Sequence, residues 1–117
     1  RGLGDVYKRQ RKEFETNLFI PGSKEGMNVE LDKAIRLYDF ITMGELVAYD
    51  ALNRNESCGG HFREEYQTEE GEAKRDDENF FYVACWEYQG DDEKAPVLYK
   101  EPLVYEAIKV QTRNYKS

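Results

Sequence analysis

The chain has 117 residues, enough for one domain at most, and its 24 acidic and 17 basic residues give a net charge of -7. The basic residues are scattered, which argues against a nucleic-acid-binding surface, because phosphate contacts require clustered Lys and Arg. No apolar run approaches the ~20 residues of a membrane span, and two cysteines make no disulfide framework, so we expect no direct membrane insertion and a reducing, cytosolic setting.

The first ten residues, RGLGDVYKRQ, show neither a helix cap nor a periodic pattern. Residues 5–10, DVYKRQ, are similar to the direct translation of the transposon end sequence that is used to tag DNA for sequencing. We therefore interpret residues 1–10 as a sequencing-adapter or assembly scar, with an ordinary basic linker as the alternative. We expect these residues to be disordered and dispensable, and residues 11–117 to be the C-terminal piece of a larger protein.

Two helices are predicted next in the chain. Residues 11–19 have the character of the last turns of a helix whose beginning is missing, and Pro21 and Gly22 end it. A long helix is predicted over residues 29–53, because Asn28 is suited to cap it and apolar residues recur at helical spacing. Most faces of its second half are apolar, so we expect it to be buried between neighbours.

The remaining residues are predicted to form loops and strands. Gly59 and Gly60 end the helical structure, and residues 64–79 are an acidic loop with room for a short helical turn. Residues 80–88, FFYVACWEY, have the profile of a strand that is apolar on both faces, so we expect both faces to be covered. Residues 96–110 supply one or two further strands. The predicted fold class is therefore α+β, a helical-bundle portion followed by a small antiparallel β-hairpin or meander.

The segment RNESCGGHFREEY, residues 54–66, contains the only histidine of the chain. A zinc site on Cys58 and His61 would need four ligands, and Cys85 lies so far along the chain that a carboxylate would have to complete the set. The same pair, as a nucleophile and its base, lacks an identifiable orienting group. A polar joint explains more of the segment, because glycines permit a sharp change of direction after a helix. Its polar side chains, Glu56, Ser57, His61 and Arg63, would satisfy helix-end carbonyls and form ion pairs across a domain boundary.

Residues 54–88 resemble the C-terminal region of the flavoprotein subunit of succinate dehydrogenase and fumarate reductase, in a family that includes L-aspartate oxidase. The family's E-S-R-G-x-H motif is matched except at Cys58, where most members carry Arg and one bacterial branch has E-S-C-G-G-H. RDDEN at residues 75–79 also matches, and VQTRNYK at residues 110–116 resembles the terminus of that branch. The resemblance extends over residues 11–117. The joint residues that it implies are Arg54, Glu56, Ser57, Cys58, Gly59, Gly60, His61, Arg63, Arg75, Asp76 and Asp77.

This resemblance implies a parent enzyme that uses FAD to interconvert succinate and fumarate, in the tricarboxylic acid cycle and electron transport. Its partners would be an iron-sulfur subunit and a membrane anchor subunit, which hold it at the inner face of the cell membrane. The family's FAD-linking histidine and substrate-binding residues lie upstream, so no catalytic, cofactor-binding or metal-binding residue is assigned here. We expect the chain alone to be inactive and to serve packing and assembly against the flavin domain of the same polypeptide. The alternative is a stand-alone acidic protein-interaction module.

Overall fold

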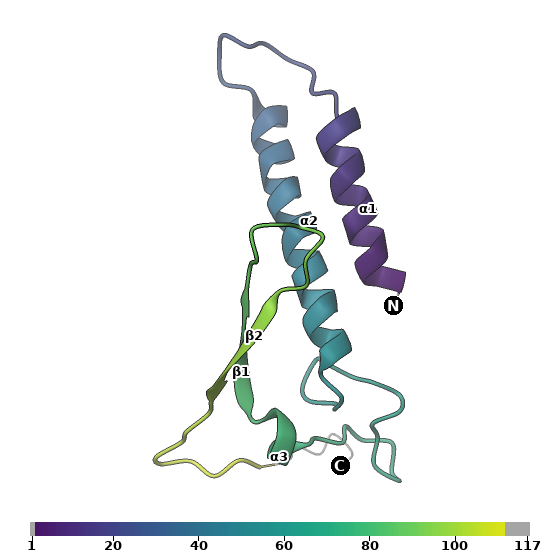
Figure 1. Ribbon diagram of the computed structural model, residues 1–117, viewed down its shortest axis with the longest axis vertical. Coiled ribbons are helices and arrows are strands. Elements are labelled where there is room, and N and C mark those ends of the chain that lie inside the picture. Colours follow the sequence, from purple (N-terminus) through teal and green to yellow (C-terminus); the bar gives the residue numbers. More distant parts are fainter. Residues whose placement is uncertain (1, 112–117) are drawn as a thin grey trace. The chain divides into compact units, whose positions relative to one another are not determined.

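The computed structural model describes residues 2–111 and divides the chain into two compact units, residues 1–53 and residues 54–117 (Figure 1). Helices come first and a two-stranded antiparallel sheet comes last, which confirms the α+β class. Residues 112–116 of the segment that resembles the family terminus lie outside the described residues. The elements are α1 (Gly2–Asn17), α2 (Val29–Asn53), α3 (Asp77–Phe80), β1 (Tyr82–Glu87) and β2 (Val97–Pro102).

Helix α2 begins and ends at the predicted residues. The Asn28 side-chain oxygen accepts hydrogen bonds from the backbone N–H groups of Glu30 and Leu31, both at 3.1 Å. These bonds satisfy two of the donors that the first turn of a helix leaves without a partner, as an N-cap does. The prediction of the cap and of the helix is therefore confirmed.

Helix α1 begins earlier than predicted, because Gly2–Gln10 are helical rather than disordered. Tyr7 lies against α2, so closely that a Cβ on Gly44 would be 2.9 Å from its ring. One turn further on, Arg11 is buried and pairs with Glu45 at 2.9 Å. The expectation of disorder was wrong because these residues, which have no pattern of their own, find partners on α2. The interpretation of residues 1–10 as a scar stays a prediction.

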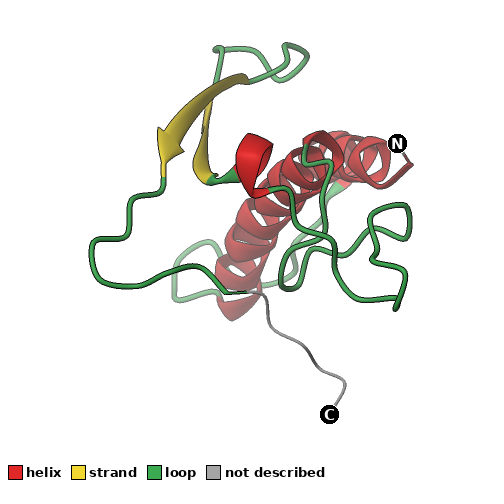
Figure 2. Ribbon diagram, turned by 90° about the horizontal axis from the view of Figure 1, so that it is seen from below, coloured by secondary structure: helices red, strands yellow, loops and turns green. Residues whose placement is uncertain are grey.

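The two helices lie side by side and pack along one face of α2 (Figure 2). The Phe14 and Tyr38 rings are 5.7 Å apart, and the Tyr38 hydroxyl donates to Glu15 at 2.7 Å. The half-buried residues of this face recur at alternating spacings of four and three, which is the seam of a packed helix pair. We call this set the inner seam: Ala34, Tyr38, Ile41, Glu45 and Ala48.

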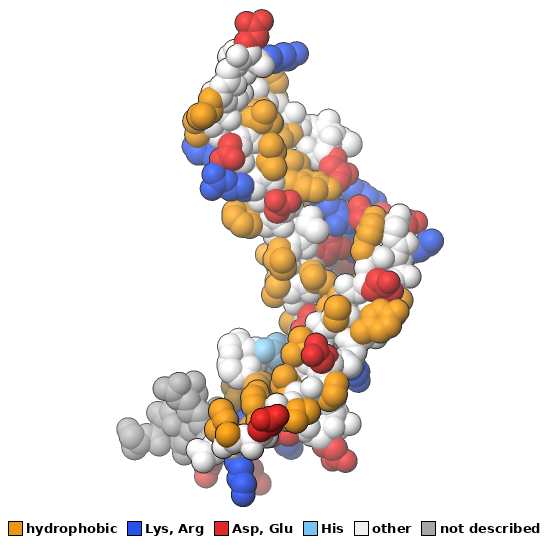
Figure 3. Space-filling model, turned by 90° about the vertical axis from the view of Figure 1, so that its left-hand side faces the viewer, with side chains coloured by type: hydrophobic (Ala, Val, Ile, Leu, Met, Phe, Trp, Pro, Cys, Tyr) orange, Lys and Arg blue, Asp and Glu red, His pale blue; other side chains and the backbone are white. Residues whose placement is uncertain are grey.

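No residue of α2 is buried, and within residues 2–111 no hydrophobic side chain of the chain is buried. Figure 3 shows hydrophobic side chains open to solvent on the face in view. The expectation that α2 is buried between neighbours is therefore met on the α1 side only, and there in part. A helix with apolar residues on several sides needs further contacts that α1 does not supply.

The second unit contains the β-hairpin. Strands β1 and β2 pair in the register Cys85↔Tyr99 and Trp86↔Leu98. Side chains of β1 alternate between half-buried, as at Trp86, and exposed, as at Val83, which is 50% exposed. The prediction that both faces are covered was wrong for this chain, because a two-stranded hairpin has only one face toward the rest of its unit. The short turn expected in the acidic loop is α3.

Candidate functional site

The predicted joint starts with a tight turn at Gly59 and Gly60. Cys58 and His61 exchange backbone hydrogen bonds of 2.8 and 3.1 Å across it. Gly59 has a φ of +58°, which a residue without a Cβ adopts without strain. The sequence prediction of a change of direction is thereby confirmed, and the turn returns the chain toward the residues that precede it.

Ser57 joins three stretches of backbone and is 0% exposed. Its hydroxyl accepts from the Arg63 amide at 2.8 Å and donates to the Arg63 carbonyl at 3.1 Å. Its own amide donates to the Lys74 carbonyl at 2.9 Å. A fully buried hydroxyl with its donor and acceptor both engaged fixes the neighbouring backbone, since loss of either bond would leave a polar group without a partner.

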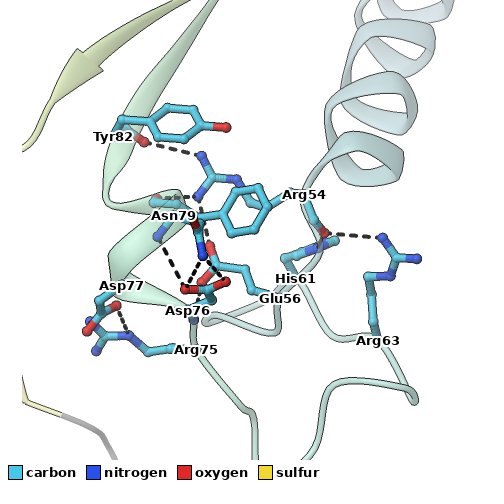
Figure 4. A network of polar contacts seen from close by, with 10 residues as sticks. Arg54, Glu56, His61, Arg63, Arg75, Asp76, Asp77, Asn79 and Tyr82 are labelled. Atoms are coloured by element: carbon cyan, nitrogen blue, oxygen red, sulfur yellow. Dashed lines mark hydrogen bonds and ion pairs between the residues drawn. The ribbon is translucent and has the colours of Figure 1, made fainter.

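Glu56 and Arg54 form the centre of the network (Figure 4). The Glu56 side chain is 3% exposed, and its two oxygens accept from Arg54 Nη1 at 2.9 Å and from the Asp76 amide at 3.0 Å. The guanidinium of Arg54 also donates to the carbonyls of Phe80 at 3.1 Å and Tyr82 at 3.2 Å. This one ion pair therefore ties the segment after α2 to α3 and the start of β1.

Two aromatic rings flank the Arg54 guanidinium. Its central carbon lies 5.7 Å from the Phe80 ring centroid and 5.0 Å from that of Tyr82. These separations are within the range of cation–π attraction. Sequence reasoning assigned Phe80 and Tyr82 to a strand and missed their role beside an arginine. Their spacing of two residues, which places them on one side of an extended chain, was the available signal.

His61 and Arg63 bind the backbone just past the end of α2. The Arg54 carbonyl accepts from His61 Nε2 at 3.0 Å and from Arg63 Nη1 at 3.3 Å. Because a carbonyl oxygen only accepts, His61 carries its proton on Nε2. This carbonyl belongs to the residue that follows Asn53, the last residue of α2, so the prediction that such side chains satisfy helix-end carbonyls stays a prediction. Arg63 also pairs with Glu65 at 2.6 Å. A backbone hydrogen bond, and to a smaller extent this pairing with Arg63, hold the pKa of the Glu65 carboxyl below its ordinary value.

The RDDEN segment closes the network from the other side. Arg75 binds both oxygens of Asp77 through Nη2, at 2.6 and 2.7 Å, and donates to the Gln111 carbonyl at 3.2 Å. The hydrogen bond that Arg75 donates to the Asp77 carboxylate raises the pKa of the Arg75 guanidinium. Asp76 caps α3 by accepting from the Asn79 amide at 3.2 Å. All eleven sequence-predicted residues thus lie within one unit. Nine of them form side-chain or backbone hydrogen bonds in the network, and the two glycines form the turn.

A cavity of about 400 Å³ opens beside this network. Five of the joint residues line its polar side: Arg54, Glu56, Cys58, Arg75 and Asp77. Aromatic and aliphatic residues from residues 80–82 and from the segment after β2 line most of the rest, among them Phe81, Leu103 and Ile108. The two arginines that face the cavity are paired with carboxylates, and Lys109 also lines it, so the cavity offers an apolar wall beside two neutralised charges and one lysine.

Two arrangements that hold dinucleotides or metal ions are not found among the described residues. The element order contains no strand that leads through a glycine-rich turn into a helix, which is the arrangement that cradles a dinucleotide. Between residues 2 and 111, no group of three His, Cys, Asp or Glu side chains could hold a metal ion. Over the same residues no helix has both the length and the apolar character needed to cross a bilayer. Chemically, the site is a set of mutually satisfied contacts.

Comparison with known families gives one result. The family model described as "Fumarate reductase flavoprotein C-term" matches residues 4–115. Neither the curated proteins nor the solved structures gave a match. The matched range contains α1 from residue 4 onward, the whole of α2 and the whole network around Arg54.

Proposed function

Since this chain belongs to the fumarate reductase flavoprotein C-terminal family, we propose that it is the C-terminal part of an FAD-dependent subunit that interconverts succinate and fumarate. The family is one of flavoprotein oxidoreductases, so the parent is an enzyme of that class. FAD and the reacting dicarboxylate bind to upstream parts of the polypeptide, and electrons pass to an iron-sulfur subunit held at the membrane by an anchor subunit. This chain contributes packing and assembly rather than chemistry.

One observation carries the assembly role: the buried side chains of the described residues are all polar, namely Arg11, Glu56 and Ser57. A self-sufficient domain of this length normally buries a hydrophobic core, which supplies most of the favourable free energy of folding. Here the large apolar residues are exposed, while the polar joint is fully built. This combination fits a piece whose apolar surface is covered by other parts of its parent.

The joint network supports a docking role of the second unit against the flavin domain. Its charges are paired internally, so the network is ordered before any partner binds and a partner meets a prearranged surface. The apolar wall of the cavity beside Arg54 provides the contact area. Cys58, which stands where most family members have Arg, is exposed at this cavity and contributes a small uncharged side chain there.

The proposal is tested by expressing the chain together with its upstream coding sequence. We expect the longer protein to purify with bound FAD and to reduce an acceptor dye with succinate. The 117-residue chain alone, titrated with FAD and with dicarboxylates, is expected to bind neither and to remain colourless. An upstream sequence without a strand–glycine-turn–helix motif, or a start codon just before Arg11, would contradict the proposal and favour the stand-alone interaction module. A flavin-loaded short chain would contradict the assignment of the cofactor site to upstream residues.

A further inference from the structure

The segment that follows β2 lies along the cavity beside Arg54. It leaves the hairpin at Leu103 and runs back toward α3 (Figure 1). We call residues 103–111 the strap, and residues 80–82, three consecutive aromatic residues, the aromatic wall. Strap and wall share a cavity of about 400 Å³, so the strap is not packed on the wall along its whole length. The strap residues that line the cavity are Leu103, Tyr105, Ile108, Lys109 and Val110.

The strap is held near its two ends. At its start, the Leu103 amide donates to the Phe81 carbonyl at 3.3 Å, and the Tyr105 and Phe81 ring centroids are 5.8 Å apart. At its other end, Arg75 Nη1 donates to the Gln111 carbonyl at 3.2 Å. Residues 106–110, in between, form no hydrogen bond or ion pair with another of residues 2–111. Within that part of the chain, the bond from Arg75 is therefore the polar contact that holds the second half of the strap.

The middle of the strap is open to solvent. Val104 is 79% exposed and Ile108 is 71% exposed. A segment opens locally at a low free energy when it has few buried contacts and few hydrogen bonds to lose. Loss of the bond from Arg75 therefore leaves the strap free to move away from the aromatic wall while β1 and β2 stay paired.

Asp77 sets the direction in which Arg75 donates (Figure 4). The Asp77 carboxylate accepts from Arg75 Nε at 2.9 Å and from Nη2 at 2.6 and 2.7 Å, which occupies one edge of the guanidinium. Because the guanidinium is planar and rigid, binding at one edge fixes the direction of the remaining nitrogen. That nitrogen, Nη1, is the one that meets the Gln111 carbonyl. A lysine at this position would keep the charge but not the fixed direction.

We propose that Arg75, positioned by Asp77, holds the strap closed over the aromatic wall, and that the strap opens when this contact is lost. The inference deepens the proposed docking role and rests on it for its purpose, because an open strap uncovers more of the wall that the flavin domain is proposed to contact. The closing contact itself is a property of the chain alone. Its failure would leave the assignment of the parent enzyme untouched.

Nitrogen-15 relaxation of the full chain measures the mobility of each strap amide. An order parameter of about 0.85 marks a rigid backbone, and one below about 0.6 marks a flexible backbone. In the natural chain we expect values above about 0.6 throughout the strap. Arg75→Gln is expected to bring residues 106–111 below about 0.6 and to leave β1 and β2 unchanged. Arg75→Lys is expected to do the same, since it keeps the charge and loses the planar group.

Arg63→Gln is the matched control. Arg63 also pairs with a carboxylate two residues later, but its Nη1 binds Asn55 and the Arg54 carbonyl rather than the strap. We expect the strap of this variant to keep the order parameters of the natural chain. The amides of β1 and β2 show in every variant that the unit remains folded.

Trypsin gives a second measurement, since Lys109 lies in the strap and Lys100 lies in β2. Arg75→Gln is expected to speed cleavage after Lys109 about tenfold, because cleavage of such a segment follows the population of its open form. Cleavage after Lys100, which requires the hairpin to open, is expected to stay unchanged.

The natural chain alone can overturn the proposal, if its strap already has order parameters below about 0.6. So does a strap that stays ordered in a folded Arg75→Gln or Arg75→Lys variant. Asp77→Asn, which leaves Arg75 in place and removes only the charge of its partner, is expected to mobilise the strap and to speed cleavage after Lys109. An unchanged strap in that variant overturns the positioning role of Asp77.

Discussion

Replacing Arg54 with Met is the most informative perturbation of the joint. Methionine keeps an unbranched side chain between the Phe80 and Tyr82 rings but removes the charge and the donors. Glu56, with 3% of its side chain exposed, then loses its ion-pair partner and keeps only the Asp76 amide at 3.0 Å. The carbonyls of Phe80 and Tyr82 lose a donor at the same time.

The expected loss of folding stability is set mainly by the Glu56 carboxylate, which stays buried without its partner. Removing one member of a buried ion pair costs about 3–5 kcal/mol, because the other charge stays desolvated without compensation. The Arg54 side chain is 19% exposed and Glu56 keeps one amide donor, so we expect a value near the lower end, about 3 kcal/mol. Folding units below about 70–80 residues rarely have more than about 3–5 kcal/mol of stability. The second unit is therefore expected to be largely unfolded in Arg54→Met without denaturant.

Trp86, the only tryptophan, lies in β1 of the same unit, so its fluorescence reports the folding of that unit. Its fluorescence during urea unfolding is compared between the natural chain and Arg54→Met, while far-UV circular dichroism follows the helices. We expect the emission of the variant in buffer to resemble that of the urea-unfolded chain. The helical signal, which comes mainly from α1 and α2, is expected to change little.

Arg36→Met is the matched control, because Arg36 also pairs with a carboxylate but both side chains are more than half exposed. Exposed pairs of this spacing contribute about 0.3–0.5 kcal/mol, so no change in Trp86 emission is expected. Glu56→Gln added to Arg54→Met removes the uncompensated charge and is expected to recover about 1–2 kcal/mol. An unfolding midpoint of Arg54→Met equal to that of the control would refute the reasoning, and so would a double variant with no recovery.

Three further predictions concern other contacts. Gly44→Ala is expected to destabilise the helix pair by about 1–2 kcal/mol in thermal unfolding, because its Cβ would meet the Tyr7 ring at 2.9 Å. Gly4→Ala, whose Cβ would have nothing within 4 Å, is expected to stabilise the pair by up to about 1 kcal/mol, and equal effects of the two changes would contradict the packing. In the flavin-loaded parent, His61→Ala is expected to lower thermal stability or flavin retention while turnover per bound flavin changes less than about tenfold, and a larger loss would indicate a catalytic role. The hydrogen bond from the Tyr99 hydroxyl to the Glu87 carboxylate raises the pKa of the phenol, so its stabilising effect is complete below the ordinary pKa of 10.0 and is lost as the pH rises through the raised value. Tyr99→Phe is therefore expected to reduce the loss of folding stability at alkaline pH, and an unchanged dependence of stability on pH would count against the bond.

The motif around residues 54–61 was predictable as a joint, but the partners of its hydrogen bonds were not. Its glycines and polar residues indicated a turn and internal pairing from the sequence alone. The structure gives His61 the Arg54 carbonyl as its partner. Glu56 accepts from Arg54 and from an amide twenty residues later. Such choices depend on which segments meet, and residue types do not specify that.

What the sequence determined by itself was local. The bounds of α2, its Asn28 cap, the turn at Gly59 and the strand character near Tyr82 follow from hydrogen bonds and periodicities that span a few residues.

The tertiary structure decided every pairing over longer distances. It made residues 2–10, which have no pattern of their own, helical by placing Tyr7 on Gly44, and it set Arg54 beside two rings more than twenty residues away. It also left Phe40, Met43 and Val47 of α2 exposed. Contacts of this kind are fixed when distant segments close on one another, and the free energy of that closure depends on the whole arrangement rather than on any short stretch of sequence.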